Sequence, residues 1–377
     1  MSKTGERAIE ILRELGARPA VPFHEQGPAQ YIESVLRRLD IDVRRDKYGN
    51  IIAHYRRGED RDRRPIAFVA HMDHPGFEIT EVDGDRMVAR ALGGVPVASL
   101  KRPTPVLALV PNSDSVSAEV HPYDGPPPEN ARECLVLVRP SSPTELTSGT
   151  PVVFDLPDFE LDGGTIRMRA LDDLAGCAAI LAALERLVSE GVESDLYAVF
   201  TRAEEVGLFG ARLVASEEAL PKDTFVVSVE SSSVISGVAQ GDGPVIRTGD
   251  ASYTFDAQAE QVLRAAAARL KERDGGFKTQ RQLMSGGTCE ATAFAGFGYR
   301  TTGIAFPLGN YHNATTRIPD PDGGVGAEYI ELSDFLGGVD LIVEAARGSA
   351  TVQEALPGPE TLGQIPDEAR ARLESTG

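Results

Sequence analysis

The alternation of helical and strand patterns after residue 173 constrains the fold more than any other feature of the chain. Helical spacing covers residues 174–190 and 207–216, and short apolar runs at 196–200 and 225–229 are typical of buried strands. Strands that alternate with helices pair in parallel and carry helices on both faces of the sheet. The sequence therefore predicts an α/β domain of three layers, αβα, with a largely parallel sheet.

The N-terminal segment fits the same domain. Apolar side chains recur at helical spacing in residues 6–16 and 27–39. The apolar run 66–70 predicts a buried strand that stops at His71. We expect two opening helices and then one strand of the central sheet.

The pattern changes between residues 76 and 164, where short β-like runs are broken by Gly, Pro, Asn and Asp. We interpret residues 76–164 as a small β domain inserted into a discontinuous α/β domain, which comprises residues 1–75 and 165–347. The length of 377 residues suits two domains. The last segment, 348–377, is rich in Pro, Gly and Glu and is predicted to be a peripheral tail.

Charge and hydropathy exclude several classes of partner. A net charge of −19 repels a phosphate backbone, so we expect no nucleic-acid partner. The N-terminus lacks the apolar stretch of a signal peptide and no later run has membrane-spanning length, which predicts no membrane partner and a cytoplasmic location. Three widely spaced cysteines, Cys134, Cys177 and Cys289, suit a reducing compartment and are expected to be ordinary buried thiols.

Residue types that ligate metal ions follow successive predicted strands. They are His71, Asp73 and His74 after the first strand, Asp172 and Asp173 before a helix, Glu204 and Glu205 after the next strand, Glu230 after another, and His312 late in the chain. The carboxyl ends of parallel strands meet at one edge of an open sheet, so we expect these side chains to converge. Each group alone has an ordinary explanation, as a loop histidine, a helix cap or an exposed helix start. Their joint occurrence favours a metal site.

The same motifs resemble those of a known clan. His-x-Asp at 71–73, Leu-Asp-Asp at 171–173, Glu-Glu-Val-Gly at 204–207, an acid after the next strand and a late histidine resemble the co-catalytic zinc aminopeptidase clan. Within that clan the chain is most similar to the glutamyl aminopeptidase and tetrahedral aminopeptidase family, over about residues 8–346. The β insertion lies between the His-x-Asp and Leu-Asp-Asp motifs, as in the tetrahedral aminopeptidases. Related carboxypeptidases and deacylases place a lid domain later in the chain.

The resemblance implies two divalent metal ions per subunit. Asp172 bridges them, His71 and Glu230 hold one ion, and Glu205 and His312 hold the other. Imidazole and carboxylate ligands suit zinc, and cobalt or manganese are also compatible.

Two further roles follow from the resemblance. Asp73 is expected to orient the His71 ring by accepting its second N–H. Glu204 is expected to be the general base, because a carboxylate bound to a metal would lack the free lone pair that proton transfer needs.

Three departures from the family pattern leave the substrate open. Glu230 stands where aminopeptidases more often carry Asp, His74 stands where Glu is usual, and Cys289 replaces an Asp in a Gly-Gly-Thr-Asp segment. A packed thiol is the expected role of Cys289, rather than a nucleophile. The first expectation is an aminopeptidase that cuts short peptides. The alternatives are an amidohydrolase or deacylase of N-acyl amino acids or specialised dipeptides, and a catalytically silent binding protein. The family often assembles into large shells, so a homo-oligomer is expected.

Overall fold

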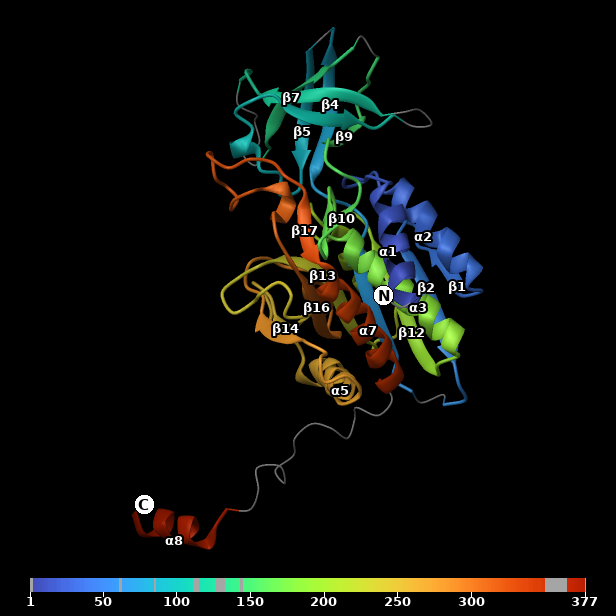
Figure 1. Ribbon diagram of the computed structural model, residues 1–377, viewed down its shortest axis with the longest axis vertical. Coiled ribbons are helices and arrows are strands. Elements are labelled where there is room, and N and C mark those ends of the chain that lie inside the picture. Colours follow the sequence, from blue (N-terminus) through green and yellow to red (C-terminus); the bar gives the residue numbers. More distant parts are fainter. Residues whose placement is uncertain are drawn as a thin grey trace.

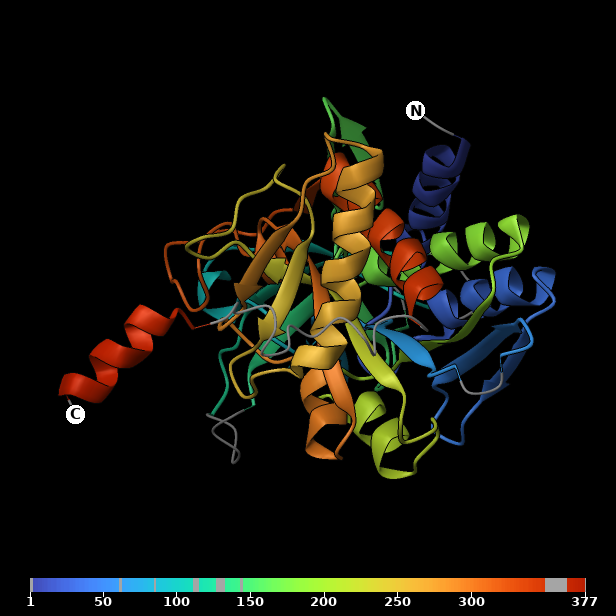
Figure 2. The same cartoon turned by 90° about the horizontal axis from the view of Figure 1, so that it is seen from below.

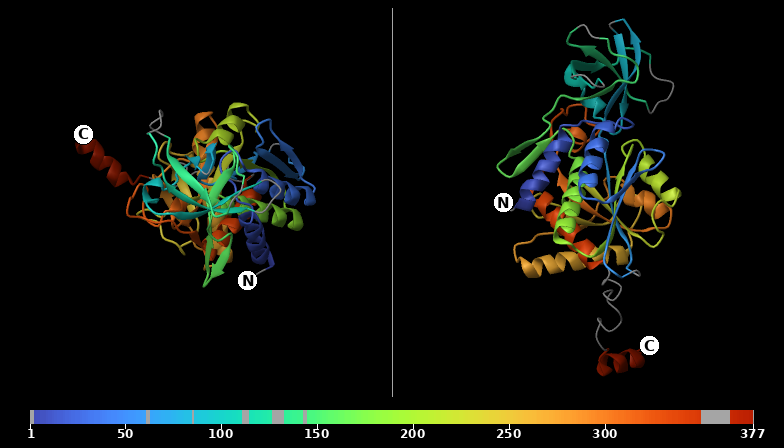
Figure 3. Two further views of the ribbon diagram at one scale, coloured as in Figure 1. Left: turned by 90° about the horizontal axis from the view of Figure 1, so that it is seen from above. Right: turned by 90° about the vertical axis from the view of Figure 1, so that its right-hand side faces the viewer.

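The computed structural model describes residues 3–60, 63–84, 86–110, 115–126, 133–142, 145–349 and 365–376. These residues form an α/β body with a β-barrel at one end of it, as Figures 1 and 3 show.

An eight-stranded sheet runs through the α/β body. In spatial order its strands are β1 (Asp42–Arg45), β2 (Ile51–Arg57), β12 (Ser194–Thr201), β3 (Ile66–His71), β13 (Phe225–Ser233), β16 (Arg300–Leu308), β14 (Val245–Gly249) and β15 (Gln280–Leu283). Pairing is parallel from β12 through β3 and β13 to β16, and again between β14 and β15. The pairs β1–β2, β2–β12 and β14–β16 are antiparallel. The predicted α/β fold is confirmed, with the parallel strands at its centre.

Helices cover both faces of this sheet (Figure 2). One face packs against α1 (Lys3–Gly16), α2 (Gln26–Arg38), α3 (Leu174–Glu190), α5 (Ala257–Arg273) and α7 (Leu332–Gly348). The other packs against α4 (Phe209–Ser216) and α6 (Glu290–Gly296). Successive side chains of a strand point to opposite faces, so Phe68 joins the first core and its neighbour Val69 the second. This arrangement gives the predicted three layers.

Helix α3 begins and ends on local signals. The Asp173 carboxylate accepts a hydrogen bond of 3.1 Å from the Gly176 backbone N–H and so caps the first turn. Gly191 closes the helix in the left-handed conformation, with φ at 63°. Asp173 therefore caps the helix, as one explanation of the motif proposed. The side chain of its neighbour Asp172 does not take part in this cap.

Six strands close into the barrel: β4 (Gly76–Asp83), β5 (Arg86–Leu92), β8 (Leu135–Pro140), β7 (Val116–Pro122), β6 (Thr104–Ala108) and β9 (Pro151–Phe154). The rings of Phe77 and Phe154 meet edge to face at 5.6 Å in its core. Two further strands, β10 (Glu160–Asp162) and β11 (Thr165–Met168), pair instead with β17 (Glu328–Glu331) in a separate three-stranded sheet. The division of the chain at residues 76 and 164 stays a prediction.

The predicted tail falls partly outside the described residues. Gly348 still belongs to α7, residues 350–364 and 377 are not described, and α8 (Asp367–Thr376) has no buried side chain. Among the helices described, none combines the length and apolar character needed to cross a membrane. Cys177 and Cys289 are buried, but Cys134 is exposed, so the expectation of a buried thiol is wrong at that position.

Candidate metal centre

Five of the predicted ligands lie together at the carboxyl edge of the central sheet. His71 is the last residue of β3, Glu205 follows β12, and Glu230 lies in β13. Asp172 precedes α3, and His312 lies in the short η2 helix (Tyr311–Asn313) after β16. Because β12, β3, β13 and β16 run in parallel, their carboxyl ends deliver these side chains to one place.

The ligand atoms form three overlapping groups within the described residues. In each group the atoms lie within 4.8 Å of one another: His71, Asp172 and Glu230; Asp172, Glu205 and His312; and His71, Glu204 and Glu205. Asp172 Oδ1 lies 3.3 Å from His71 Nε2, and its Oδ2 lies 3.7 Å from His312 Nε2. One oxygen of Asp172 thus faces each histidine, as a carboxylate shared between two cations requires.

Two buried carboxylate oxygens of this cluster have no hydrogen-bond partner. They are Asp172 Oδ1 and Glu205 Oε1. A buried charged oxygen without a partner is costly, because nothing replaces its lost hydration. A cation at either ligand group would supply the missing partner, so the donor set fits divalent metal ions. Imidazole with carboxylate suits zinc, cobalt or manganese.

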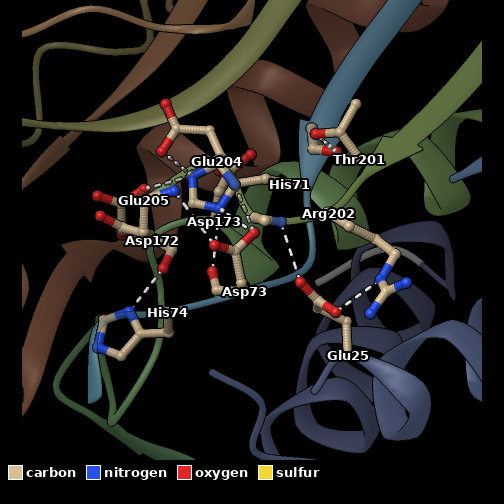
Figure 4. A network of polar contacts seen from close by, with 12 residues as sticks. Glu25, His71, Asp73, His74, Asp172, Asp173, Thr201, Arg202, Glu204 and Glu205 are labelled. Carbon is tan, nitrogen blue, oxygen red and sulfur yellow. Dashed lines mark hydrogen bonds and ion pairs between the residues drawn. The ribbon is translucent and has the colours of Figure 1, made fainter. Parts of the chain in front are cut away.

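Asp73 supports the cluster through both its backbone and its side chain. The Nδ1–H of His71 donates to the backbone carbonyl of Asp73 at 3.0 Å, whereas the nearest Asp73 carboxylate oxygen is 3.7 Å away. That carboxylate accepts the backbone N–H groups of Glu204 and Glu205, at 3.0 and 3.1 Å (Figure 4). The contact expected between Asp73 and the His71 ring is thus made by the backbone carbonyl. The Asp73 side chain instead fixes the loop that carries the two glutamates.

Glu25 fixes the same loop from the other side, and no sequence motif indicated this role. Its buried carboxylate accepts the backbone N–H of Ala203 at 2.9 Å and that of Phe23 at 2.8 Å. It also pairs with the Arg202 guanidinium at 2.7 Å (Figure 4). A lone acid before a helix looks like an ordinary helix start, so no pattern distinguished it.

Glu328 is a second buried carboxylate that the sequence did not indicate. Its Oε2 accepts the backbone N–H groups of Leu171 and Asp172, at 2.7 and 3.0 Å. Its Oε1 accepts the backbone N–H of His312 at 2.9 Å. One side chain in β17 therefore holds the backbone of two candidate ligands.

His74 lies beside the cluster and in none of the ligand groups of the described residues. Its ring is buried, with Nδ1 2.7 Å from the carbonyl oxygen of Asp172 and Nε2 2.9 Å from Oδ1 of Asn313. The ring thus connects the turn after β3 to the segments that carry Asp172 and His312.

The cluster shifts the pKa values of its members. Burial raises the pKa of Glu204 to about 8, although the nearby His71 lowers it in part. Burial also raises the pKa of Asp73 to about 6 and lowers the pKa of His312 to about 4. For His71, burial lowers the pKa, but the neighbouring carboxylates, Glu204 foremost, outweigh burial and raise it well above its usual value.

A pocket of about 40 Å³ opens onto the cluster. Its lining includes residues of the cluster and several others, namely His71, Asp172, Glu204, Glu230, Ile235, Arg247, Met284, Tyr311 and His312. Arg247 is 2% exposed and its Nε has no hydrogen-bond partner.

Cys289 lies outside this lining. Its Sγ is 3.7 Å from a carboxylate oxygen of Asp250, and burial raises the pKa of the thiol to about 11. A thiol that stays protonated is a poor nucleophile.

Comparison with known proteins points to one family. Residues 143–322 match the family model of the M42 glutamyl aminopeptidases. This range contains Asp172, Glu204, Glu205, Glu230 and His312. A protein of Acetivibrio thermocellus, whose own assignment as an aminopeptidase is provisional, is 24% identical over 359 residues, which cover 90% of this chain and 98% of that protein.

Solved structures show the same fold. The TET1 peptidase of Pyrococcus horikoshii is 23% identical with a TM-score of 0.73, covering 90% of this chain and 99% of that one. A TET aminopeptidase from a marine sediment archaeon of the Thaumarchaeota is 19% identical with a TM-score of 0.76, covering 92% and 99%. Together with the family match, these likenesses confirm the predicted resemblance to the M42 glutamyl aminopeptidase family, and the chain is a peptidase.

Proposed function

We propose that this protein is a dinuclear metal-dependent aminopeptidase that acts on short peptides. The main observation in support is the position of Asp172. Its two carboxylate oxygens lie 3.3 Å from His71 Nε2 and 3.7 Å from His312 Nε2. In this proposal Asp172, His71 and Glu230 would hold one ion, and Asp172, Glu205 and His312 would hold the other. Zinc is the expected metal, with cobalt or manganese as alternatives.

The chemistry follows from the charges around the pocket. Two divalent cations, when bound, polarise the scissile carbonyl and lower the pKa of water beside them. Glu204 lines the same pocket, and its Oε2 lies 3.8 Å from His71 Nε2. Its carboxylate is the group that accepts a proton from water and returns it to the leaving amine. Asp73 holds the Glu204 backbone in place for this transfer.

The small pocket at the cluster argues against large substrates. A volume of about 40 Å³ excludes a folded chain. The names of the relatives support removal of N-terminal residues from peptides, since these proteins are named as aminopeptidases or as a TET peptidase. The TET1 peptidase is described as assembling into a tetrahedron or an octahedral shell, and we propose a homo-oligomer for this chain as well. The cytoplasmic location stays a prediction.

The experiment that tests this function compares matched substrates. The metal-loaded protein is incubated with dipeptides and tripeptides that carry a free α-amino group and with the same peptides after N-acetylation. Release of the N-terminal residue from the free-amine set alone is the expected result. Cleavage of the acetylated set alone would replace the proposal with a deacylase, and no cleavage of either set would favour a binding protein.

A further inference from the structure

Two consecutive glycines of the barrel lie against the side chains that we propose to hold the second metal ion. Gly93 and Gly94 follow β5, whose end points toward the α/β body in Figure 1. The segment then continues into the short η1 helix (Val97–Ser99) and β6. This turn contacts Glu205 and His312.

The carbonyl of Gly94 faces the His312 ring. His312 Nδ1 lies 3.2 Å from the Gly94 carbonyl oxygen, while Nε2 lies 3.3 Å from Glu205 Oε2. A carbonyl oxygen only accepts hydrogen bonds, so Nδ1 carries the proton and donates it. The lone pair of Nε2 is then directed toward the carboxylates, where a metal ion would bind.

The two glycines also leave no room for side chains. A Cβ at Gly94 would lie 2.6 Å from His312 Cε1 and closer still to Nδ1. A Cβ at Gly93 would lie 3.0 Å from Glu205 Cβ, and the φ of Gly93 is 80°, a region that other residues rarely adopt. Each glycine therefore lies against a different member of the same ligand group.

The turn is tied to the barrel and to the loop that follows His312. Val95 is buried in the barrel core. Ser99 Oγ donates a hydrogen bond of 2.7 Å to the Asp320 carbonyl, and Lys101 pairs with Asp322 at 3.2 Å. The segment after the glycines thus holds the loop beyond His312, while Gly94 holds the ring itself.

We infer that the Gly93–Gly94 turn is a positioning element of the second metal site, so that the barrel is part of the metal centre as well as a neighbour of it. This inference rests on the proposed function. In this view the barrel orients the His312 ring, because the Gly94 carbonyl is the hydrogen-bond acceptor for Nδ1. A shift of the barrel would then weaken one metal site and leave the His71 site intact.

The test is a metal titration of the Gly94→Ala variant of the full chain. The metal-free protein is titrated with Zn²⁺ by calorimetry, beside wild type and Gly275→Ala, a control whose Cβ would meet no atom within 4 Å. The added Cβ would push the His312 ring away from the Gly94 carbonyl, and loss of such a supporting contact lowers metal affinity by about 10–100-fold. We expect that loss at one of two sites in Gly94→Ala and none in the control. Unchanged affinity at both sites of a folded Gly94→Ala protein would overturn the inference.

A second measurement covers the case in which Gly94→Ala fails to fold. Long-range ¹⁵N–¹H NMR of the Zn²⁺-loaded wild type reports which nitrogen of His312 carries the proton. A proton on Nδ1 is expected, and a proton on Nε2 would overturn the inference. The His312→Ala variant separates the two proposals. If it binds two ions, the proposed function fails, whereas loss of one ion there but none in Gly94→Ala rejects the barrel's role alone.

Discussion

Glu328 and His312 are joined by a hydrogen bond of 2.9 Å from the His312 backbone N–H to the Glu328 carboxylate. The second oxygen of that carboxylate accepts the N–H groups of Leu171 and Asp172. The segments that carry Asp172 and His312 are far apart in sequence, and Glu328 fixes the backbone of both. This buried carboxylate therefore helps to set their spacing.

We predict that Glu328→Gln weakens zinc binding by about 10–100-fold, because an amide has one acceptor oxygen where the carboxylate has two. Its NH₂ group would also face a backbone N–H, which costs about 1–3 kcal/mol of unfolding free energy when the donor is left unpaired. Zinc titration and urea unfolding measure the two effects. The exposed Glu160→Gln is the control. Equal zinc affinity in both variants would contradict the positioning role.

The two-ion assignment predicts different losses in two histidine variants. His71→Ala removes a candidate ligand from the group with Asp172 and Glu230. His312→Ala removes one from the group with Asp172 and Glu205. Each variant is expected to keep one ion and lose the other. Metal analysis after dialysis gives the stoichiometry, and His54→Ala, whose ring pairs with Asp195 away from the cluster, serves as the control. Two ions in either ligand variant would refute its place in the site.

Local sequence patterns predicted the elements on which the candidate ligands lie. The helix at 174–190 was predictable because it is a long apolar segment rich in Ala and Leu and because Gly191 ends it. The strand that stops at His71 was predictable because every residue of β3 is buried, which leaves an uninterrupted apolar run. The structure brings these ends together as the parallel order implies.

Supporting contacts were not predictable, because they join segments with no pattern in common. Glu328 and Gly94 contact His312 from a separate strand and from the barrel, and neither lies in a motif. The contact between Asp73 and His71 was expected, but the atom of Asp73 that makes it was not predictable. Sequence identifies the residue but does not distinguish its carboxylate from its carbonyl, and the turn after β3 places the carbonyl at the ring.

The raised carboxyl pKa values predict how the stability of the metal-free protein depends on pH. The pKa of Glu204 is about 8 in the folded protein against an ordinary 4.5, so the folded state binds the proton more tightly. Stability from this group is complete below pH 4.5 and is lost as pH rises toward 8. The pKa of His312 is lowered from 6.5 to about 4, so its contribution to stability rises with pH. That rise is confined to the interval between pH 4 and pH 6.5.

Above pH 6.5 the contribution of Glu204 remains unopposed by His312, and His71, whose pKa is raised, adds to it. We therefore expect the free energy of unfolding in chelator to fall between pH 6.5 and pH 8. Urea unfolding at the two pH values measures it. Glu204→Gln, which cannot ionise, should show a smaller fall. Stability that rises over this interval would contradict the shifts.

The last prediction concerns Glu204, for which a catalytic and a structural role give different outcomes. Glu204→Gln keeps the size of the side chain and the backbone hydrogen bond to Asp73, but it removes the proton acceptor. We expect kcat to fall by about 10²–10⁴-fold, the usual contribution of general acid–base catalysis. Zinc stoichiometry should stay at the wild-type value, because two complete ligand groups do not contain Glu204.

Steady-state kinetics on a free-amine dipeptide and metal analysis of the same preparation separate the outcomes, with Glu272→Gln on the exposed side of α5 as the control. If Glu204 were only an acid near a helix start, its replacement would cost about 0.3–1 kcal/mol of stability and leave kcat unchanged. Wild-type turnover by a metal-replete variant would thus reject the mechanism. Loss of one ion instead would exchange the roles of Glu204 and Glu205, since both lie in the ligand group with His71.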